Sequence, residues 1–339
     1  MLAAVEAAGL ETNPVSYPLN SFENRVYEVE LADRSRVIAK FYRPGRWTRE
    51  QILEEHTFLD DLAREEVPIG TLRAFPDGST LREIDGIWYA LADRRGGRAP
   101  DELDDALLRR LGRLVGRVHN VGARREAPQR PRLDADRYVR RNLRWLEEHG
   151  TLPGALRARY FDAAEAAAAI ADERMAGVAM HRVHADLHLG NLLLRDGVLT
   201  LLDFDDFVTG PAVQDLWLAL PGRGAETGRQ CEVLLEGYEE MRAFDRGTLD
   251  LIEPLRALRM VRYAVWIARR WNDPAFRIGW PQFCEPDFWR RETEDLEEQV
   301  AVIRGEASPA LEAARRERPE TVEPAAELTN KDYFWDWEA

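Results

Sequence analysis

The stretch HADLHLGNLLLRDGVLTLLDFDD covers residues 184–206 and holds polar residues at set distances from one another. Asn191 comes five positions after Asp186, and Asp203 comes twelve positions after Asn191. His184 stands two positions before Asp186. One such Asp alone is typical of a turn or a helix cap. Together and in this order, the four residues indicate a site.

A short β-hairpin is predicted between the two polar parts of this stretch. The apolar runs Leu192–Leu194 and Val198–Leu202 predict its strands. Asp196-Gly197 lies between them and is typical of a two-residue turn, because these residues adopt the backbone angles that such turns need. We therefore expect Asp203 just beyond a hairpin.

Transfer of a phosphoryl group from ATP explains why these residue types occur together. The reaction needs a carboxylate that orients and deprotonates the acceptor hydroxyl, and it needs hard oxygen ligands for Mg²⁺. Asp186 is the candidate base. Asn191 and Asp203 are the candidate metal ligands, and Asp203 is thereby also a candidate catalytic residue. Asn191 adds a ligand without adding another negative charge beside the phosphates.

The composition is that of a globular protein with more acidic than basic residues. The 339 residues are enough for about two domains or lobes, and the formal net charge is −14. No dense basic stripe offsets this charge, so we expect no nucleic-acid partner. Cys231 and Cys284 lie far apart and are predicted to be free thiols. Because we find neither a signal peptide nor an apolar run that could span a bilayer, we expect a cytoplasmic protein without a membrane partner. We also expect a monomer.

Two predicted strands in the first part of the chain carry a candidate nucleotide contact. Residues 20–31 predict a turn that runs into an alternating strand, and Arg36–Tyr42 predict the next strand. Lys40 lies on the second strand, within the tetrapeptide VIAK. A lysine at such a place is usually a solvated edge residue. Its other role, contact with nucleotide phosphates, requires a carboxylate partner from elsewhere.

The helix predicted after these strands supplies that partner. Its first residues, TREQ, have the spacing of a capping box, and the helix carries the three carboxylates of Glu50, Glu54 and Glu55. Glu55 lies on the apolar stripe of the helix and is expected to face inward, so we predict that it pairs with Lys40. Glu54 is the alternative partner. Glu50 is expected to interact with the dipole at the start of the helix.

A change of composition after residue 93 marks the predicted boundary between two lobes. Three further strands come before it, at 72–76, 81–85 and 86–93, and the segment RRGGR follows it. We expect an N-lobe at 1–93 with a small antiparallel sheet and one helix, and a larger, mainly helical C-lobe at 94–306. Residues 307–339 form a tail that is rich in Pro, Glu and Ala and then aromatic. The predicted fold class is α+β.

Apolar spacing predicts five helices after the boundary. They cover 104–121, 136–149, 155–175, 226–242 and 248–271. His119, at the end of the first, is expected to pack in the interior, and Asp215 is expected to brace the structure. The last helix is rich in Arg and Trp. It is either a buried helix with an arginine-rich exposed face or a wall of the groove that receives the acceptor.

Many segments of the chain resemble the bacterial stress response kinase A family. This family lies within the aminoglycoside/choline phosphotransferase superfamily, which shares the protein-kinase fold. The matching segments are HADLHLGN, LLDFDD, GPAVQDLW, PLNSFENRVYEVE, VIAKFYRPGRWTREQILEEHTFL, EEVPI, LIEPLRALRMVRY and RRWNDPAF, so the resemblance covers nearly the whole chain before the tail. It implies a bilobal kinase that uses ATP and Mg²⁺ and phosphorylates Ser or Thr of proteins in the stress response.

The functional residues of that family carry over to this chain at matching positions. Asp186 matches the proton acceptor, and Asn191 and Asp203 match the magnesium ligands. Lys40 matches the lysine that binds the nucleotide. In a kinase of this kind Glu55 would hold that lysine toward the phosphates.

The loop over the phosphates departs from the pattern of ordinary kinases. Ser21–Arg25 matches this loop by position but contains no glycine. Ser21 and Asn24 are therefore the candidates to contact the nucleotide through their side chains. Ala92, at the end of the strand before the lobe boundary, marks the hinge whose backbone would contact adenine.

Two further departures concern the metal loop and the catalytic loop. The sequence at 203–206 is Asp-Phe-Asp-Asp and not Asp-Phe-Gly, and Gly210-Pro211 follow after a short interval. There is no room for a long activation segment, so we expect no regulation by its phosphorylation. Ala185 stands where the family commonly has glycine.

Three functions are compatible with these residues. The first is a protein Ser/Thr kinase, and the second is a kinase for a small molecule with a hydroxyl group, such as an amino sugar, a choline-like compound or a sugar. The third is a nucleotide-binding pseudokinase that acts as a scaffold or sensor. The absence of glycine from the phosphate loop motivates the third function, and the presence of Asp186, Asn191, Asp203 and Lys40 argues against it.

Overall fold

Two compact units make up the computed structural model, which describes residues 1–19, 21–285 and 287–306. Unit 1 comprises residues 1–131, 181–209 and 218–244, and unit 2 comprises 132–180, 210–217 and the chain from 245 onward. Unit 1 thus contains the whole predicted N-lobe and three parts of the predicted C-lobe, and the boundary after residue 93 stays a prediction. The predicted tail at 307–339 lies outside the described residues.

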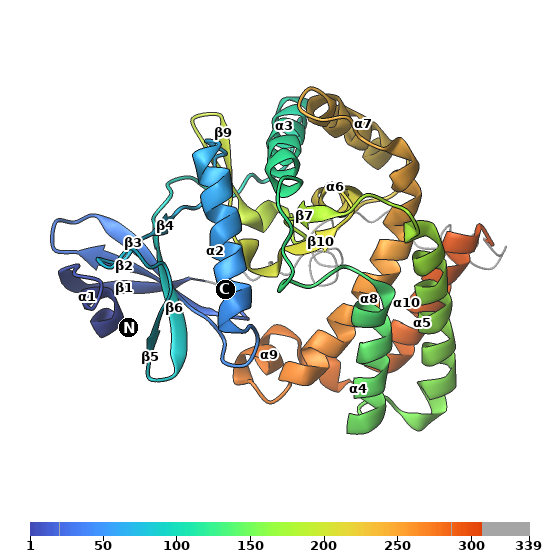
Figure 1. The fold of residues 1–339 in the computed structure, drawn as a ribbon. Helices are drawn as coiled ribbons and strands as arrows, with labels where there is room; N and C mark the ends of the chain where they lie inside the picture. The colour runs from blue at the N-terminus through green and yellow to red at the C-terminus, as the bar shows by residue number, and fades with distance from the viewer. Residues whose placement is uncertain (20, 286, 307–339) are drawn as a thin grey trace. The chain divides into compact units, whose positions relative to one another are not determined.

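Unit 1 is built around a six-stranded antiparallel sheet with the order β1-β2-β3-β6-β4, in which β5 pairs with β6 (Figure 1). The strands are β1 (Thr12–Leu19), β2 (Arg25–Leu31), β3 (Arg36–Phe41), β4 (Leu72–Arg73), β5 (Arg82–Ile84) and β6 (Ile87–Asp93). Strands β2 to β6 fall within the predicted segments. Strand β1 was not predicted, because Pro14 and Pro18 break its pattern. Its place at the edge of the sheet tolerates proline, which cannot donate a ladder hydrogen bond.

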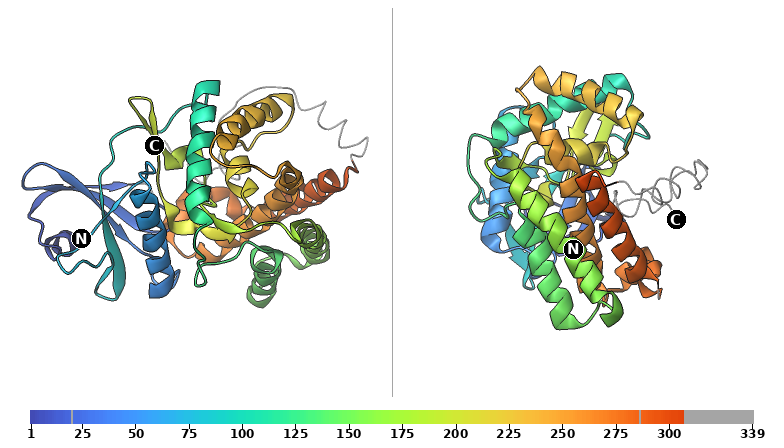
Figure 2. Two further views of the ribbon diagram at one scale, coloured as in Figure 1. Left: turned by 45° about the horizontal axis from the view of Figure 1, so that its top comes forward. Right: turned by 90° about the vertical axis from the view of Figure 1, so that its right-hand side faces the viewer.

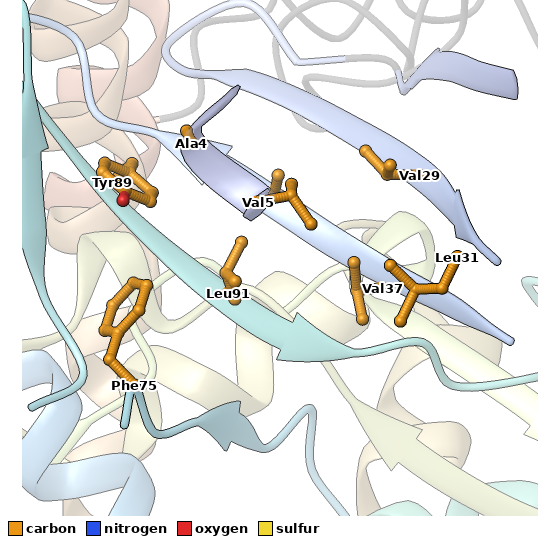
Figure 3. Packing of buried hydrophobic residues seen from close by; sticks show 9 residues of the cluster. Ala4, Val5, Val29, Leu31, Val37, Phe75, Tyr89 and Leu91 are labelled. Atoms are coloured by element: carbon orange, nitrogen blue, oxygen red, sulfur yellow. The ribbon is translucent and has the colours of Figure 1, made fainter. Parts of the chain in front are cut away.

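Alternation along the central strands directs one set of side chains into a core and the other set to the opposite face. The core contains Ala4 and Val5 of helix α1 (Leu2–Glu6) beside buried residues of β2, β3 and β6 (Figure 3). Its members from these strands are Val29, Leu31, Val37, Ala39, Tyr89 and Leu91. Because successive side chains of a strand point to opposite faces, Lys40 lies on the face away from this core.

Helix α2 (Arg49–Arg64) begins with the predicted capping box. The backbone N–H of Gln51 donates to the hydroxyl of Thr48 over 3.3 Å, and the backbone N–H of Thr48 donates to the side chain of Gln51 over 2.9 Å. The buried face of the helix carries Ile52, Glu55, Phe58, Leu59 and Leu62. The prediction that Glu55 faces inward is therefore confirmed.

Helices α3 (Asp105–Gly122) and α7 (Ala225–Glu239) lie side by side in unit 1 (Figure 1). Gly112 of α3 faces the backbone of α7 at Leu234, and Gly237 of α7 faces the backbone of α3 at Arg109. A Cβ atom at either glycine would overlap a backbone carbonyl oxygen. The two helices approach this closely because neither position carries a side chain.

Four further short strands form two pairs. Strands β7 (His181–Val183) and β10 (Val208–Gly210) pair with each other, and so do β8 (Leu192–Arg195) and β9 (Val198–Leu201). His119 at the end of α3 is fully buried, and its Nδ1 lies 3.0 Å from the hydroxyl oxygen of Tyr238. It is a packed residue, as predicted.

Helices are the main elements of the described part of unit 2. Its elements are the π-helix η1 (Asp136–Arg140), α4 (Arg141–His149), α5 (Gly154–Met175), the start of α6 (Val213–Ala219), the 3-10 helix η4 (Arg246–Leu251), α8 (Ile252–Arg270), α9 (Pro274–Gly279), the 3-10 helix η5 (Pro281–Cys284) and α10 (Phe288–Arg304). Helices α5, α8 and α10 pack side by side (Figure 2). The predicted helices at 136–149, 155–175 and 248–271 are present, while α6, α9 and α10 were not predicted.

The arginine-rich helix α8 does not present its arginines on one exposed face, which corrects the simpler of the two expectations for this helix. Arg256 and Arg259 are buried, with exposed fractions of 7% and 6%. The guanidinium carbons lie over aromatic rings: Arg256 over Trp217 at 5.1 Å, Arg262 over Tyr138 at 4.8 Å and Arg269 over Trp145 at 5.1 Å from the ring centroid. Such contacts stabilise a packed helix.

Two expectations about the whole chain can be compared with the structure. In the described part of the chain, no helix has the length and apolar character needed to cross a membrane. Cys231 and Cys284 form no disulfide, as predicted.

Candidate active site

The predicted hairpin is present and brings the two ends of the 184–206 stretch together. Strands β8 and β9 pair in antiparallel register with Leu192 opposite Leu201. Beyond this pair, the backbone N–H of Leu202 donates to the carbonyl oxygen of Asn191 over 2.9 Å. The hairpin thus places Asn191 beside the residue that precedes Asp203.

His184 and Asn191 hold the backbone around Asp186. The backbone N–H of Asp186 donates to Nδ1 of His184 over 3.2 Å, so Nε2 of this ring carries the proton that it shares with the carbonyl of Leu202 at 2.7 Å. The side-chain amide of Asn191 donates to the carbonyl oxygen of Asp186 over 2.9 Å. His188, which the sequence did not single out, has its Nε2 3.5 Å from Oδ2 of Asp186. The predicted base is therefore held at its backbone and contacted at its carboxylate.

Ala185, which precedes Asp186, and Asp203 adopt backbone angles that favour glycine. The φ angle is 67° at Ala185 and 54° at Asp203. A side chain in this left-handed region costs roughly 1–2 kcal/mol. The angle at Ala185 gives a physical reason for the glycine that the resembled family commonly has there. Strained residues of this kind are frequent at functional sites.

Lys40 is held by three carboxylates. Its Nζ lies 3.1 Å from Glu55 Oε1, 3.2 Å from Asp203 Oδ1 and 3.2 Å from Asp205 Oδ1. The predicted pairing with Glu55 is present, and the sequence prediction of Lys40 and Asp203 at one site agrees with this geometry. Asp205 was not predicted to take part.

Glu54, the alternative partner, has a different task. Its carboxylate accepts hydrogen bonds from the backbone N–H groups of Gln129 and Arg130, over 3.0 Å and 2.8 Å. It therefore joins α2 to the segment that precedes unit 2. Glu50 is exposed in the first turn of the helix, as expected for a residue that interacts with the helix dipole.

The electrostatic environment of the Lys40–Glu55 pair favours a charged lysine. Burial alone would lower the pKa of Lys40, but the carboxylates of Asp205, Glu55 and Asp203 outweigh it and hold that pKa well above its usual range. Burial raises the pKa of Glu55 to about 7, against the opposing effect of Lys40. Glu55 thus titrates near neutral pH, because it is fully buried beside other carboxylates.

A chain of buried hydrogen bonds continues from Glu55 into the interior. The hydroxyl of Tyr42 lies 3.4 Å from Glu55 Oε2 and 2.9 Å from Nε2 of His56, whose Nδ1 lies 2.8 Å from the hydroxyl of Thr80. Burial, followed by the charge of Lys40, lowers the pKa of His56 to about 3, so this ring is neutral. These hydrogen bonds hold the carboxylate oxygen of Glu55 that does not contact Lys40. No sequence pattern pointed to them, because Tyr42 and Thr80 lie outside helix α2, in segments distant along the chain.

Asp205, Arg46 and Arg130 complete the charged centre, and the sequence did not predict them. Arg46 pairs with Asp205 and, at 2.7 Å, with Asp206. Arg130 donates to the backbone carbonyl of Asp205 and, over 3.1 Å, to that of Phe207. The run of acidic residues at 203–206 could have indicated that nearby cations balance its charge. It could not show which cations, because Arg46 and Arg130 lie far away in the sequence.

The two candidates in the phosphate loop make their bonds within the protein. The hydroxyl of Ser21 accepts from the backbone N–H of Asn24 over 3.2 Å. The side-chain amide of Asn24 donates to Asp205 Oδ2 over 3.1 Å, and its oxygen accepts from the backbone N–H of Arg43 over 3.2 Å. Contact of Ser21 and Asn24 with a nucleotide stays a prediction.

Ala92 lies on β6, on the same face of the sheet as Lys40. In the strand register Ala92 stands opposite Ile38, and Val26 stands opposite Lys40. The side chains of Val26, Ile38 and Ala92 are half-buried. A partly exposed apolar strip beside a cation could hold a flat ring that carries phosphates. The sequence analysis did not name Val26 and Ile38, but the alternation of side chains along the strands could have placed them on the same face as Lys40.

The donor types at the site fit Mg²⁺ bound together with a nucleotide. The nitrogen of the Asn191 side chain is engaged with the Asp186 carbonyl, which leaves its oxygen as a ligand, and the side chain of Asp203 is 41% exposed. Among the residues that the structure describes, no group of three or more His, Cys, Asp or Glu could hold a metal ion. Mg²⁺ in phosphoryl-transfer sites needs few protein ligands, because phosphates and water supply the others.

Comparisons with known proteins identify the family of this chain. The phosphotransferase enzyme family matches residues 17–252. "Stress response kinase A" of Escherichia coli strain K12 is 40% identical over 305 residues, which cover 87% of this chain and 90% of that protein. "Serine/threonine protein kinase RdoA" of Salmonella typhimurium strain LT2 is 40% identical over 289 residues, which cover 84% of this chain and 87% of that protein.

The chain therefore belongs to the phosphotransferase enzyme family and is an ATP-dependent kinase. Within this class it belongs to the stress response kinase A family, as its motifs predicted.

Solved structures show the same fold. The structure of amicoumacin kinase hAmiN in complex with AMP-PNP, Ca²⁺ and Ami has a TM-score of 0.70 and 20% identity, and the match covers 88% of this chain and 93% of that one. A microcompartment-associated aminopropanol kinase has a TM-score of 0.67 and 19% identity, with 89% and 95% covered. At these identities the likeness concerns the fold alone. The predicted α+β, protein-kinase-like fold is confirmed.

Proposed function

We propose that this protein is a serine/threonine protein kinase that uses ATP and Mg²⁺ and acts as a cytoplasmic monomer in the stress response. The observation that carries the proposal is its 40% identity, over most of the chain, to relatives named stress response kinase A and serine/threonine protein kinase RdoA. The position of Lys40 between Glu55 and Asp203 supports it, because a kinase needs this lysine held toward the phosphates.

In this proposal each residue has one task in the transfer. Asp186 orients the acceptor hydroxyl and takes its proton as the oxygen attacks the γ-phosphorus and the bond to ADP breaks. Lys40 binds phosphate oxygens, and Glu55 holds it in place. Asn191 and Asp203 would hold Mg²⁺, which would supply positive charge against the negative charge that develops during the transfer.

The test is phosphoryl transfer from labelled ATP with Mg²⁺ to the protein itself and to a basic test protein. We expect wild type to label protein on Ser or Thr, and Asp186→Asn to lower the rate by about 100-fold or more, since general base catalysis contributes 10²–10⁴-fold. Asp162→Asn is the control, because Asp162 is an exposed aspartate of α5. Labelling by Asp186→Asn at the wild-type rate would contradict the proposal.

The same experiment separates the two other functions that the residues allow. Rapid ATP turnover with a panel of amino sugars, choline-like compounds and sugars, and none with proteins, would identify a small-molecule kinase. Nucleotide binding without turnover on any acceptor would identify a pseudokinase. The two kinase outcomes differ in the identity of the labelled product, and a pseudokinase gives no labelled product.

A further inference from the structure

Asp205 occupies the position at which ordinary kinases have glycine in Asp-Phe-Gly. Its exposed fraction is 2%, and it lies two residues after Asp203, the proposed metal ligand. A buried carboxylate is costly unless cations and hydrogen-bond donors surround it. The groups that contact the Asp205 carboxylate therefore indicate which parts of the site this residue connects.

Those partners come from different parts of unit 1. Oδ1 of Asp205 lies 3.2 Å from Nζ of Lys40. Oδ2 accepts from the side-chain amide of Asn24 over 3.1 Å and pairs with the guanidinium of Arg46. Arg130 fixes the backbone of the same residue by donating to its carbonyl oxygen. One carboxylate thus joins the lysine strand, the phosphate loop and the metal loop.

The phosphate loop is fixed on its other side as well. Arg43 donates to the carbonyl oxygens of Phe22 and Glu23, over 2.8 Å and 2.9 Å, and its backbone N–H donates to Asn24 Oδ1. Within Ser21–Arg25 no residue has a positive φ angle, so the backbone of this loop has no need of glycine. Hydrogen bonds from Arg43 thus fix the backbone of the loop, and the side chain of Asn24 connects the loop to Asp205.

We propose that Asp205 is a positioning residue that ties the glycine-free phosphate loop, through Asn24, to the metal loop at 203–206, so that nucleotide binding and Mg²⁺ binding strengthen each other. The inference rests on the proposed function, since it takes Asp203 as a metal ligand and Ser21–Arg25 as the loop over the phosphates. Movement of one loop is passed to the other because Asn24 of the phosphate loop donates to the buried carboxylate that the metal loop itself carries. Coupling of this kind is reciprocal: each ligand raises the affinity for the other by one factor.

Binding of a fluorescent ATP analogue, measured with saturating Mg²⁺ and with EDTA, tests the coupling without any turnover. The quantity of interest is the ratio of the two dissociation constants. We expect a ratio of about 10 or more in wild type, within the usual range for coupled sites, and a fall of roughly fivefold or more in Asn24→Ala and in Asp205→Asn. The double variant should fall no further than Asp205→Asn alone, because both changes break one connection.

A structural role without coupling predicts a different result. General loosening of the site would weaken binding equally with and without Mg²⁺ and leave the ratio unchanged. Asn13 and Glu30 provide a matched control pair, since the amide of Asn13 donates to Glu30 over 3.1 Å elsewhere in unit 1. Asn13→Ala, Glu30→Gln and their double variant should keep the wild-type ratio.

Two outcomes overturn the inference: a wild-type ratio in folded Asn24→Ala, or additive effects in the double variant. If Asp205→Asn does not fold, Asn24→Asp replaces it, because a second carboxylate against Asp205 should lower the ratio further than Asn24→Ala does. Failure of the proposed function has another signature. In that case wild type itself binds no analogue, or binds it without any effect of Mg²⁺.

Discussion

Single side chains decide the chemistry of this site, and the Lys40–Glu55 pair shows how far sequence can identify them. The apolar stripe of α2 placed Glu55 on the inner face and left Glu54 as the alternative. The structure confirms that Glu55 pairs with Lys40. This pairing was predictable because it requires only that the inner face of α2 lies against the strand of Lys40. The pattern could not give the degree of burial, which raises the pKa of Glu55 to about 7.

We predict a pH-dependent stability difference between wild type and Glu55→Gln. Since the pKa of Glu55 in the folded protein is raised above its model value of 4.5, the folded state binds the proton more tightly than the unfolded state. This contribution to stability is fully present below about pH 4.5 and is lost as the pH rises through about 7. The free energy of unfolding of Glu55→Gln, relative to that of wild type, should therefore be higher at about pH 8 than at about pH 5, by on the order of 2 kcal/mol. Urea unfolding at both pH values measures the difference.

Glu50→Gln on the same helix is the control for this titration. Glu50 is exposed, and hydrogen bonds from its own backbone N–H and from the Thr48 side chain lower its pKa, so its contribution to stability has the opposite pH dependence. It is present above about pH 4.5 and is lost as the pH falls. A stability difference between wild type and Glu55→Gln that stays constant from about pH 5 to about pH 8 would show that Glu55 does not titrate in this range.

The residues that sequence missed share one property, which is a partner far away along the chain. Asn24 and Asp205 are 181 positions apart, and Arg46 and Asp205 are 159 positions apart. Periodicity and local motifs describe neighbours within a helix or a hairpin. They identified Asp186, Asn191 and Asp203 as a set because a single hairpin joins them. They could not show which distant cation balances an acidic run.

Helices and strands were predictable where their buried faces are apolar. The prediction failed at β1, whose prolines are tolerated at an edge, and at α10. The buried face of α10 includes the polar residues Glu292, Thr293 and Gln299, which interrupt its apolar stripe. Where tertiary contacts satisfy buried polar groups, the periodic signal is lost before the structure is known.

The close contact between α3 and α7 leads to a prediction about stability. Gly112→Ala should lower the free energy of unfolding by about 2 kcal/mol, because a new methyl group would overlap the backbone of α7 and force the helices apart. Urea or thermal unfolding of the purified variant measures this loss.

Gly228→Ala is a matched control on α7 itself. A Cβ at Gly228 would meet no atom within 4 Å, so alanine should add roughly 1 kcal/mol through its better helix propensity. The two substitutions are the same chemical change with opposite expected signs. Equal effects at both positions would show that helix propensity, and not the contact between the helices, controls stability here.

The whole chain is organised so that neither unit is a continuous segment. The chain passes between the units five times, at 131/132, 180/181, 209/210, 217/218 and 244/245. This interleaving was hidden from the sequence, which placed a single boundary after residue 93. Every residue proposed to bind the nucleotide or the metal lies in unit 1. An interleaved chain closes its loops only when both units fold, which favours one cooperative transition.

We therefore predict that the two units unfold together and that a ligand of unit 1 stabilises both. Of the eight tryptophans in the described residues, only Trp47 and Trp88 lie in unit 1, so intrinsic fluorescence reports mainly on unit 2. Mg²⁺ with ATP at about 100 times its dissociation constant should add about 2.7 kcal/mol to the free energy of unfolding seen by this fluorescence. Release of a fluorescent ATP analogue, which reports on unit 1, should occur at the same urea concentration. Asp203→Asn should show a smaller shift with the same ligands, and two separate transitions, or a shift confined to the analogue signal, would refute the prediction.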